Sequence, residues 1–227
     1  LDSRVLNALS STAQSAYKFA DDMRLLQHDE QLEEPFAKSQ VGSSAMAYKR
    51  NPMRSERICS LARFVCVTAQ NAAMTASAQW LERTLDDSAN RRLSIPESFL
   101  ATDAVLRLMA DVTSGIVVNE GVIARALNNT LPFLASEDIL MDAVREGGDR
   151  QACHELIRAH SMESRARMRE GFPCDLIERL ADDPAFPLSR DQLCTRLDPA
   201  AFTGRCAAQV EAFLAAHPVE DAADSLS

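Results

Sequence analysis

The feature that most constrains the fold is residues 52–85, a run with proline only at its first position and no glycine. A helix over the whole run would be about 50 Å long at about 1.5 Å per residue. Such a helix needs several neighbours to cover it, so the run predicts a multi-helix bundle shared between subunits. Its small and aliphatic residues recur at three- and four-residue steps, as one face of a helix requires: Ile58, Leu61, Val65, Ala69, Ala72, Ala73 and Ala76.

The composition also favours helices. Aromatic residues make up 5% of the 227 residues and glycine occurs seven times, while Ala, Leu, Arg and Glu are plentiful. No segment shows the alternation of polar and apolar residues that is typical of a strand. The expected fold class is all-α, with a long-helix bundle followed by a small all-helical C-terminal domain.

The pattern of the first expected helix begins at the first residue of the sequence. The apolar stripe starts at the first residue with no capping residue before it, and Pro35 closes it. We therefore expect the sequence to be a fragment of a longer chain. Residues 38–50 have no period and predict a loop, after which Asn51 is the expected N-cap and Pro52 the first helical position of the long helix.

Two domains are expected. Polar residues 86–90 interrupt the helical pattern, and a further helix ends at Gly115. Residues 1–115 would form part of a central helical bundle with a loop over 38–51, and residues 116–227 a small helical domain with a frayed acidic tail. Short helices are expected in the second domain over residues 119–129, 136–146, 149–170, 175–181, 189–196 and 203–216.

Charge and cysteine content exclude several classes of protein. The formal net charge is −9, which argues against a nucleic-acid partner. The six cysteines include no C-x-x-C pair, and no carboxylate or thiol joins His154 and His160 at ligand spacing, so no metal site is expected. Without a signal peptide or an apolar run of about 18 residues, we expect a cytoplasmic protein that does not contact membranes.

The loop holds the side chains that could carry chemistry. Ser43 and Ser44 follow a glycine, and Lys49 and several arginines come after them. A serine acts as a base only where cations or oriented amides stabilise its alkoxide, and these cations suit a substrate with carboxylates. The alternative is a flexible Gly-Ser-Ser turn followed by arginines that coat a helix surface.

The order of residues in this loop is highly restrictive. Residues 42–52, GSSAMAYKRNP, resemble the signature loop of the fumarase/aspartase superfamily, whose members eliminate fumarate from a substituted succinate. Residues 80–92, WLERTLDDSANRR, are similar in particular to the adenylosuccinate lyase family. The similarity covers almost the whole chain and continues through residues 131–139, 147–155 and 202–205.

The resemblance implies a β-elimination that uses no cofactor. Ser43 matches the family's base, which removes a proton from the carbon next to a carboxylate. The resulting dianion needs cations and amides where its charge grows. Lys49 and Asn51 match the positions that hold the succinyl carboxylate, and Arg57 matches a substrate-binding arginine.

Further loop positions are implied to close over the substrate. Ser44 and Met46 complete the loop that excludes water from the site. Ala47 stands where the family pattern has proline, so this loop loses a restraint on φ.

A second group of residues is implied to bind the nucleotide end of the substrate, including its phosphate. Arg83, Ser88 and Arg92 match the family positions for this role, and two guanidiniums and a hydroxyl at a helix break can hold a phosphate. The alternative is that the two arginines pair with Asp86 and Asp87.

The family's general-acid histidine lies upstream of this sequence, so the isolated chain is expected to be inactive without an N-terminal segment. None of the histidines present matches that position: His28, His154, His160 and His217.

The length of the expected helix implies a shared site. Ser43 would lie at most about 27 Å of chain before Pro52, and Arg83 about 47 Å further along the helix. The two groups would therefore meet across subunits, in agreement with the superfamily's homotetramers.

The function implied is that of a carbon–nitrogen lyase of purine biosynthesis. It would release fumarate from adenylosuccinate, giving AMP, and from succinylaminoimidazole carboxamide ribotide. Two alternatives remain: a catalytically inactive helical assembly module, or a lyase for another substrate such as argininosuccinate. The phosphate-binding residues argue against the last, since an amino-acid substrate has no phosphate.

Overall fold

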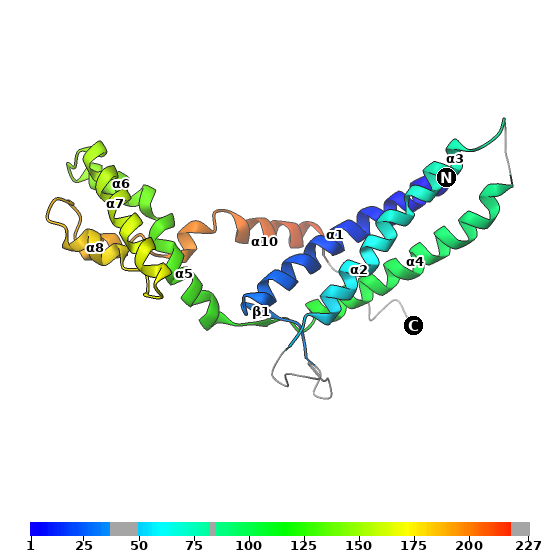
Figure 1. The fold of residues 1–227 in the computed structure, drawn as a ribbon, viewed down its shortest axis with the longest axis horizontal. Coiled ribbons are helices and arrows are strands. Elements are labelled where there is room, and N and C mark those ends of the chain that lie inside the picture. The colour runs from blue at the N-terminus through cyan, green and yellow to red at the C-terminus, as the bar shows by residue number, and fades with distance from the viewer. Residues whose placement is uncertain (37–49, 82–84, 219–227) are drawn as a thin grey trace. The chain divides into compact units, whose positions relative to one another are not determined.

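The computed structural model describes residues 1–36, 50–81 and 85–218, and nearly all their regular structure is helical (Figure 1). The predicted all-α fold is confirmed. The chain divides into two compact units, Leu1–Ile123 and Ala124–Ser227. The domain limits expected from the sequence stay a prediction.

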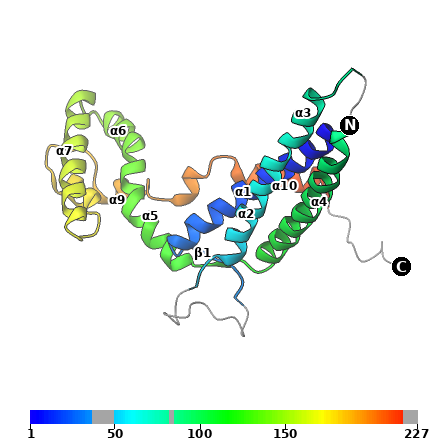
Figure 2. The ribbon, with the colours of Figure 1, turned by 45° about the vertical axis from the view of Figure 1, so that its right-hand side comes forward.

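The first unit is built on three long helices, α1 (Asp2–His28), α2 (Met53–Thr68) and α4 (Asp86–Thr113). They run side by side in both views (Figures 1 and 2). Small residues on α1 let the helices approach closely. The core between them consists of Ala16, Ala20 and Met23 from α1, Ile58 and Cys59 from α2, and Val105 and Val112 from α4.

The prediction of one helix over residues 52–85 is wrong. The segment forms α2 and then α3 (Gln70–Ser77), which is separated from α2 by Ala69. The helix does not reach residue 85 because α3 buries none of its residues, so tertiary packing adds little stability there. Leu81 then has a φ of 51°, in the left-handed region outside a right-handed helix.

The expected polar break at residues 86–90 is also wrong, since this segment forms the first turns of α4. Asp86 and Asp87 lie in its first turn. Carboxylates there interact favourably with the positive end of the helix. A helix therefore begins where the polarity of the sequence suggested a loop.

Asn51 is not the N-cap of α2. The helix begins at Met53 with Pro52 as N-cap, and no side chain caps it locally. The N–H groups of its first turn are instead bonded to the carboxylate of Glu34, which accepts from the backbone N–H groups of Arg54 and Ser55 at 3.1 and 2.6 Å.

One short antiparallel ribbon joins β1 (Leu32–Glu33) to β2 (Val117–Val118), with Leu32 opposite Val118. The sequence predicted no strand, because two residues are too few to show an alternation. Gly115 permits the approach of these segments, since a Cβ there would lie 2.8 Å from Cβ of Pro35.

The second unit consists of shorter helices. The expected stops and starts are largely confirmed: α6 ends just before Gly147, and Asp149 caps α7 by accepting from the N–H of Ala152 at 2.9 Å. Helix α5 continues beyond residue 129 because Leu131 and Pro132 are buried. The elements are α5 (Glu120–Leu134), α6 (Ser136–Arg145), α7 (Arg150–Arg169), α8 (Leu176–Asp182), α9 (Arg190–Cys194), a 3-10 helix (Pro199–Phe202) and α10 (Cys206–Ala216).

No helix in the described part of the chain is long and apolar enough to cross a membrane.

Candidate functional site

Four of the expected site residues lie in the described part of the first unit: Asn51, Arg57, Ser88 and Arg92. The others lie outside the described residues: Ser43, Ser44, Met46, Lys49 and Arg83.

The segment that leads into α2 is held by Arg50. Its Nη1 donates to Oε2 of Glu33 at 2.8 Å, and its guanidinium lies 5.0 Å from the ring centroid of Phe36. Its carbonyl oxygen accepts from Nε2 of Gln27 at 3.2 Å. These contacts anchor the backbone immediately before Asn51, so its position depends on α1 and β1.

Glu33 joins three segments of the chain. Nδ2 of Asn119 donates to its Oε1 at 3.1 Å, while Arg50 contacts the other oxygen. The hydrogen bond from Asn119, and then the nearby Arg50 guanidinium, hold the pKa of Glu33 below its ordinary value. Glu33 is therefore a carboxylate at neutral pH, in which state it stabilises the approach to α2.

Asn51 lines a cavity of about 1070 Å³ within the first unit. Its side-chain amide forms no hydrogen bond with a described residue, so it can donate to a ligand. The cavity is also lined by Arg24 and Arg50, which pair with Asp21 and Glu33, and by the carboxylates of Glu30 and Glu56. Both guanidiniums are therefore already paired with carboxylates, and the amide of Asn51 stays available to a ligand.

Arg24, which lies on α1, was not among the site residues expected from the sequence. Its Nη1 donates to Oδ1 of Asp21 at 3.1 Å, but its Nε is buried and has no hydrogen-bond partner among the described residues. The available signal was a cation three residues after an aspartate near the end of a helix. That spacing indicates a local ion pair and does not reveal a cavity.

Arg57 does not line this cavity. It is exposed on α2, it is absent from the described residues that line the cavity, and it forms no ion pair with them. The structure therefore does not bring Arg57 together with Asn51.

Ser88 and Arg92 lie one turn apart in the first turns of α4. Ser88 is half-buried and Arg92 is exposed. Within the described ranges Arg92 has no hydrogen bond or ion pair, whereas its neighbour Arg91 donates to Oδ1 of Asp2 at 2.9 Å. The alternative in which Arg92 pairs with Asp86 or Asp87 is thus not observed, and its guanidinium can contact a ligand.

Asn51 and the Ser88–Arg92 pair lie at opposite ends of the first unit. Nε of Arg54, near the start of α2, lies 2.7 Å from Oδ2 of Asp111 near the end of α4. Ser88 is about 35 Å from Asp111 at the rise of an α-helix. A single chain therefore does not bring these two groups into one pocket.

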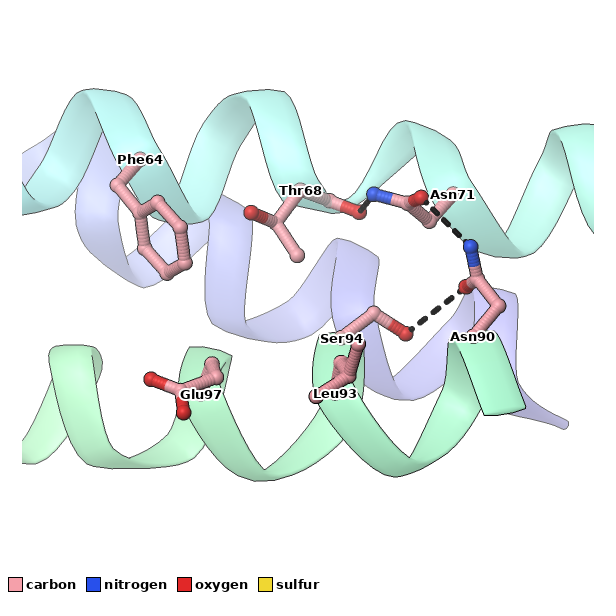
Figure 3. Close-up of a pocket in the computed structure, with 7 residues that line it drawn as sticks. All are labelled: Phe64, Thr68, Asn71, Asn90, Leu93, Ser94 and Glu97. Carbon is pink, nitrogen blue, oxygen red and sulfur yellow. Dashed lines mark hydrogen bonds between the residues drawn. The ribbon is translucent and has the colours of Figure 1, made fainter. Parts of the chain in front are cut away.

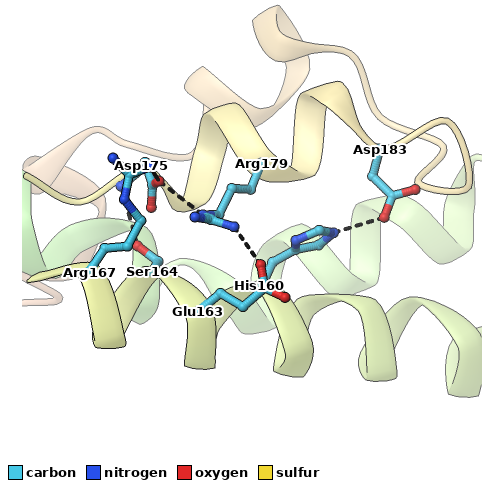
Figure 4. Close-up of polar contacts among 7 residues, drawn as sticks. All are labelled: His160, Glu163, Ser164, Arg167, Asp175, Arg179 and Asp183. Carbon is cyan, nitrogen blue, oxygen red and sulfur yellow. Dashed lines mark hydrogen bonds and ion pairs between the residues drawn. The ribbon is translucent and has the colours of Figure 1, made fainter.

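In the second unit, polar contacts tie α7 to α8 and to the segment after it (Figure 4). Nε2 of His160 lies 2.8 Å from Oδ2 of Asp183, and Arg179 bonds to both Glu163 and Asp175. The hydrogen bond from His160 lowers the pKa of Asp183. These contacts hold His160 against the segment that follows α8.

No group of three His, Cys, Asp or Glu side chains in residues 1–36, 50–81 and 85–218 could hold a metal ion.

Solved structures show which fold the chain shares. The 3-carboxy-cis,cis-muconate lactonizing enzyme of Pseudomonas putida matches 94% of this chain with a TM-score of 0.80 at 24% identity, and the match covers 47% of that enzyme. A fumarate lyase from Mesorhizobium sp. BNC1 matches 94% of the chain with a TM-score of 0.74 at 20% identity, over 46% of its own length. The fold is the helical fold of the fumarase/aspartase superfamily.

Sequence comparison identifies the family within this class. Family models described as "Lyase" and "Adenylosuccinate lyase C-terminus" match residues 3–67 and 132–213. Adenylosuccinate lyases of Schizosaccharomyces pombe and Saccharomyces cerevisiae are 48% and 49% identical over 215 residues, which is 94% of this chain. The chain therefore belongs to the adenylosuccinate lyase family. It spans 45% of the length of these two relatives.

Proposed function

We propose that this chain supplies the central and C-terminal parts of an adenylosuccinate lyase. The enzyme releases fumarate from adenylosuccinate, giving AMP, and from succinylaminoimidazole carboxamide ribotide, in the cytoplasm and without a cofactor. The observation that carries the proposal is the identity of 48% and 49% to two adenylosuccinate lyases over 94% of the chain.

In the proposed mechanism Ser43, as its alkoxide, removes a proton from the succinyl carbon next to a carboxylate. The electron pair of that C–H bond forms the double bond of fumarate as the C–N bond breaks, and an acid must protonate the leaving nitrogen. Lys49 and Asn51 hold the carboxylate on which charge develops. Ser44 and Met46 cover the site and exclude water. The amide of Asn51, which lines a cavity and forms no hydrogen bond with a described residue, supports this assignment.

The nucleotide end is assigned to Arg83, Ser88 and Arg92, with Arg57 as a further substrate contact. Support comes from α4, where Ser88 and Arg92 are four residues apart and so share one helix face. Arg92 is exposed and has no ion pair in the described part of the chain. Its guanidinium can thus bind a phosphate oxygen directly.

The separation of the two groups supports a site built from several chains of a homotetramer. Asn51 and Ser88 lie about 35 Å apart along the α2–α4 pair, by the rise of an α-helix. No small substrate spans that distance. The succinyl-binding residues of one subunit would therefore meet the phosphate-binding residues of another.

A chimera tests the proposed function. The matching 215-residue segment of the Saccharomyces cerevisiae adenylosuccinate lyase is replaced by this chain, so that the relative supplies the remaining sequence. We expect fumarate release from adenylosuccinate, followed by absorbance, and its loss in the Ser43→Ala variant. The chain alone is expected to show no turnover.

The outcomes separate the alternatives. A folded chimera that does not release fumarate would favour the helical assembly module. A chimera that is active on argininosuccinate, and not on the nucleotide substrates, would favour another lyase of the superfamily.

A further inference from the structure

A chain of hydrogen bonds links the α2–α3 break to the start of α4 (Figure 3). Nδ2 of Asn71 donates to the carbonyl oxygen of Thr68 at 3.0 Å, and Nδ2 of Asn90 donates to Oδ1 of Asn71 at 3.0 Å. Oγ of Ser94 donates to Oδ1 of Asn90 at 3.3 Å. Each asparagine amide thus both donates and accepts.

These bonds are shielded from water at both ends. Thr68 and Ser94 are 8% and 7% exposed, and the two asparagines between them are half-buried. The chain of bonds borders a cavity of about 400 Å³ that Phe64 and Leu93 also line. Partial burial makes such bonds stronger than exposed ones and makes the loss of one partner costly.

The position of Asn90 on α4 determines which face of this helix the bonds hold against α3. Asn90 lies two residues after Ser88 and two before Arg92, so it is rotated by about 200° from each on a helix of 3.6 residues per turn. Anchoring Asn90 against α3 therefore turns the face that carries Ser88 and Arg92 away from α3. A small rotation of this turn would displace both side chains together.

We propose that Asn71 and Asn90 are positioning residues for the substrate phosphate. They hold the first turns of α4 against the α2–α3 break, so that Ser88 and Arg92 present one preformed phosphate-binding face. This inference rests on the proposed function. Two neutral amides perform the task without adding charge to a turn that already holds Asp86 and Asp87.

The test compares substrates with and without the phosphate, using Asn71→Ala and Asn90→Ala in the chimera. Misplacing Ser88 and Arg92 should lower kcat/KM for adenylosuccinate by about 10- to 100-fold, mainly through KM. For the same substrate lacking its 5′-phosphate, the change should be less than about twofold, because no phosphate contact remains to be lost. Asn7→Ala on the exposed surface of α1 is the matched control and should alter neither value.

A second measurement uses the chain itself. Backbone amides of residues 86–94 should exchange hydrogen faster in both alanine variants, while those of α7 should not change. Asn90→Asp should behave like Asn90→Ala, because a carboxylate cannot donate to Asn71.

The outcomes are distinct. Equal losses of kcat/KM for the two substrates would show a general structural effect and overturn the positioning role, as would unchanged kinetics or unchanged exchange. A parent chimera without turnover would instead refute the proposed function on which the inference rests.

Discussion

The carboxylate of Glu34 accepts a hydrogen bond of 2.6 Å from the backbone N–H of Ser55, and both residues are buried, at 5% and 0% exposure. The other carboxylate oxygen accepts from the N–H of Arg54 at 3.1 Å. The first turn of a helix lacks partners for these N–H groups within the helix itself. Glu34 therefore caps α2 from a segment that precedes the candidate catalytic loop.

Replacing Glu34 should destabilise the first unit. Glu34→Ala leaves one buried and one partly buried N–H group without an acceptor, and we expect the free energy of unfolding to fall by about 1–3 kcal/mol. Urea titration of the chain, followed by circular dichroism, measures this change. Glu97→Ala, at an exposed position of α4, should change it by less than about 0.5 kcal/mol. Equal effects of the two substitutions would contradict the capping role.

Two adjacent glycines should respond differently to alanine. A Cβ at Gly148 would lie 2.7 Å from Sγ of Cys153 and 2.8 Å from the carbonyl oxygen of Ala143, so Gly148→Ala should cost about 1–3 kcal/mol by overpacking. Gly147 has a φ of 93° and no atom within 4 Å of the added Cβ. Gly147→Ala should therefore cost only backbone strain, about 1–2 kcal/mol.

Crystal structures of the two glycine variants provide the decisive comparison. Displacement of Cys153 in Gly148→Ala, with no movement around residue 147 in the other variant, is the expected result. An undisturbed Cys153 would show that the space at Gly148 is larger than the structure indicates.

The pair of Asp142 and Arg196 should make the second unit sensitive to acid. Nε and Nη2 of Arg196 donate to the two carboxylate oxygens at 2.5 and 2.8 Å, and Arg196, followed by Arg145, lowers the pKa of Asp142. A carboxyl whose pKa is lowered on folding contributes stability above its unfolded pKa, and this contribution is lost as pH falls through the folded pKa. Stability should therefore decrease from about pH 5 downward.

Asp142→Asn removes this contribution, so its urea midpoint should be lower than that of the original chain at pH 7 and should approach it at pH 3. Arg145→Ala removes a more exposed partner and should retain most of the pH dependence. If Asp142→Asn and the original chain lost stability in parallel with falling pH, the pair of Asp142 and Arg196 would not be the source of the acid sensitivity.

Neighbouring arginines on α4 should differ in their effect on catalysis. In the chimera, Arg92→Ala should raise KM for adenylosuccinate at least about tenfold, because the proposed charged hydrogen bond to phosphate would be lost. Arg91→Ala removes an equal charge, but Arg91 pairs with Asp2, so the change should stay within about threefold. Steady-state kinetics of the two variants measure the difference. Similar increases in KM would mean that phosphate binding depends only on the total charge of this turn and not on the position of Arg92.

Local signals explain why the second unit was largely predictable. Asp149 caps α7 through a bond three residues away, and Ser189 and Gln192 form a capping box at the start of α9. These contacts join neighbours in the chain, so a short stretch of sequence contains both partners. The stop at Gly147 is equally local, since glycine adopts a positive φ without strain.

The candidate site was predictable in its residue types and not in its geometry. The signature loop and the spacing of Ser88 and Arg92 could be read along the chain. The hydrogen bond between Asn71 and Asn90 could not be predicted in this way. These residues are 19 positions apart, and they meet only where the helix predicted over residues 52–85 is broken. Helical periodicity does not show where packing ceases to support a helix.

The sequence by itself determined that the chain is helical, which family it resembles, and which side chains are candidates for the reaction. Tertiary structure alone decided where the long helix breaks, which carboxylate caps α2, and which face of α4 is turned outward. The physical reason is that hydrophobic period and capping act between residues within a turn or two of each other, whereas burial and long-range hydrogen bonds depend on segments that only folding brings together.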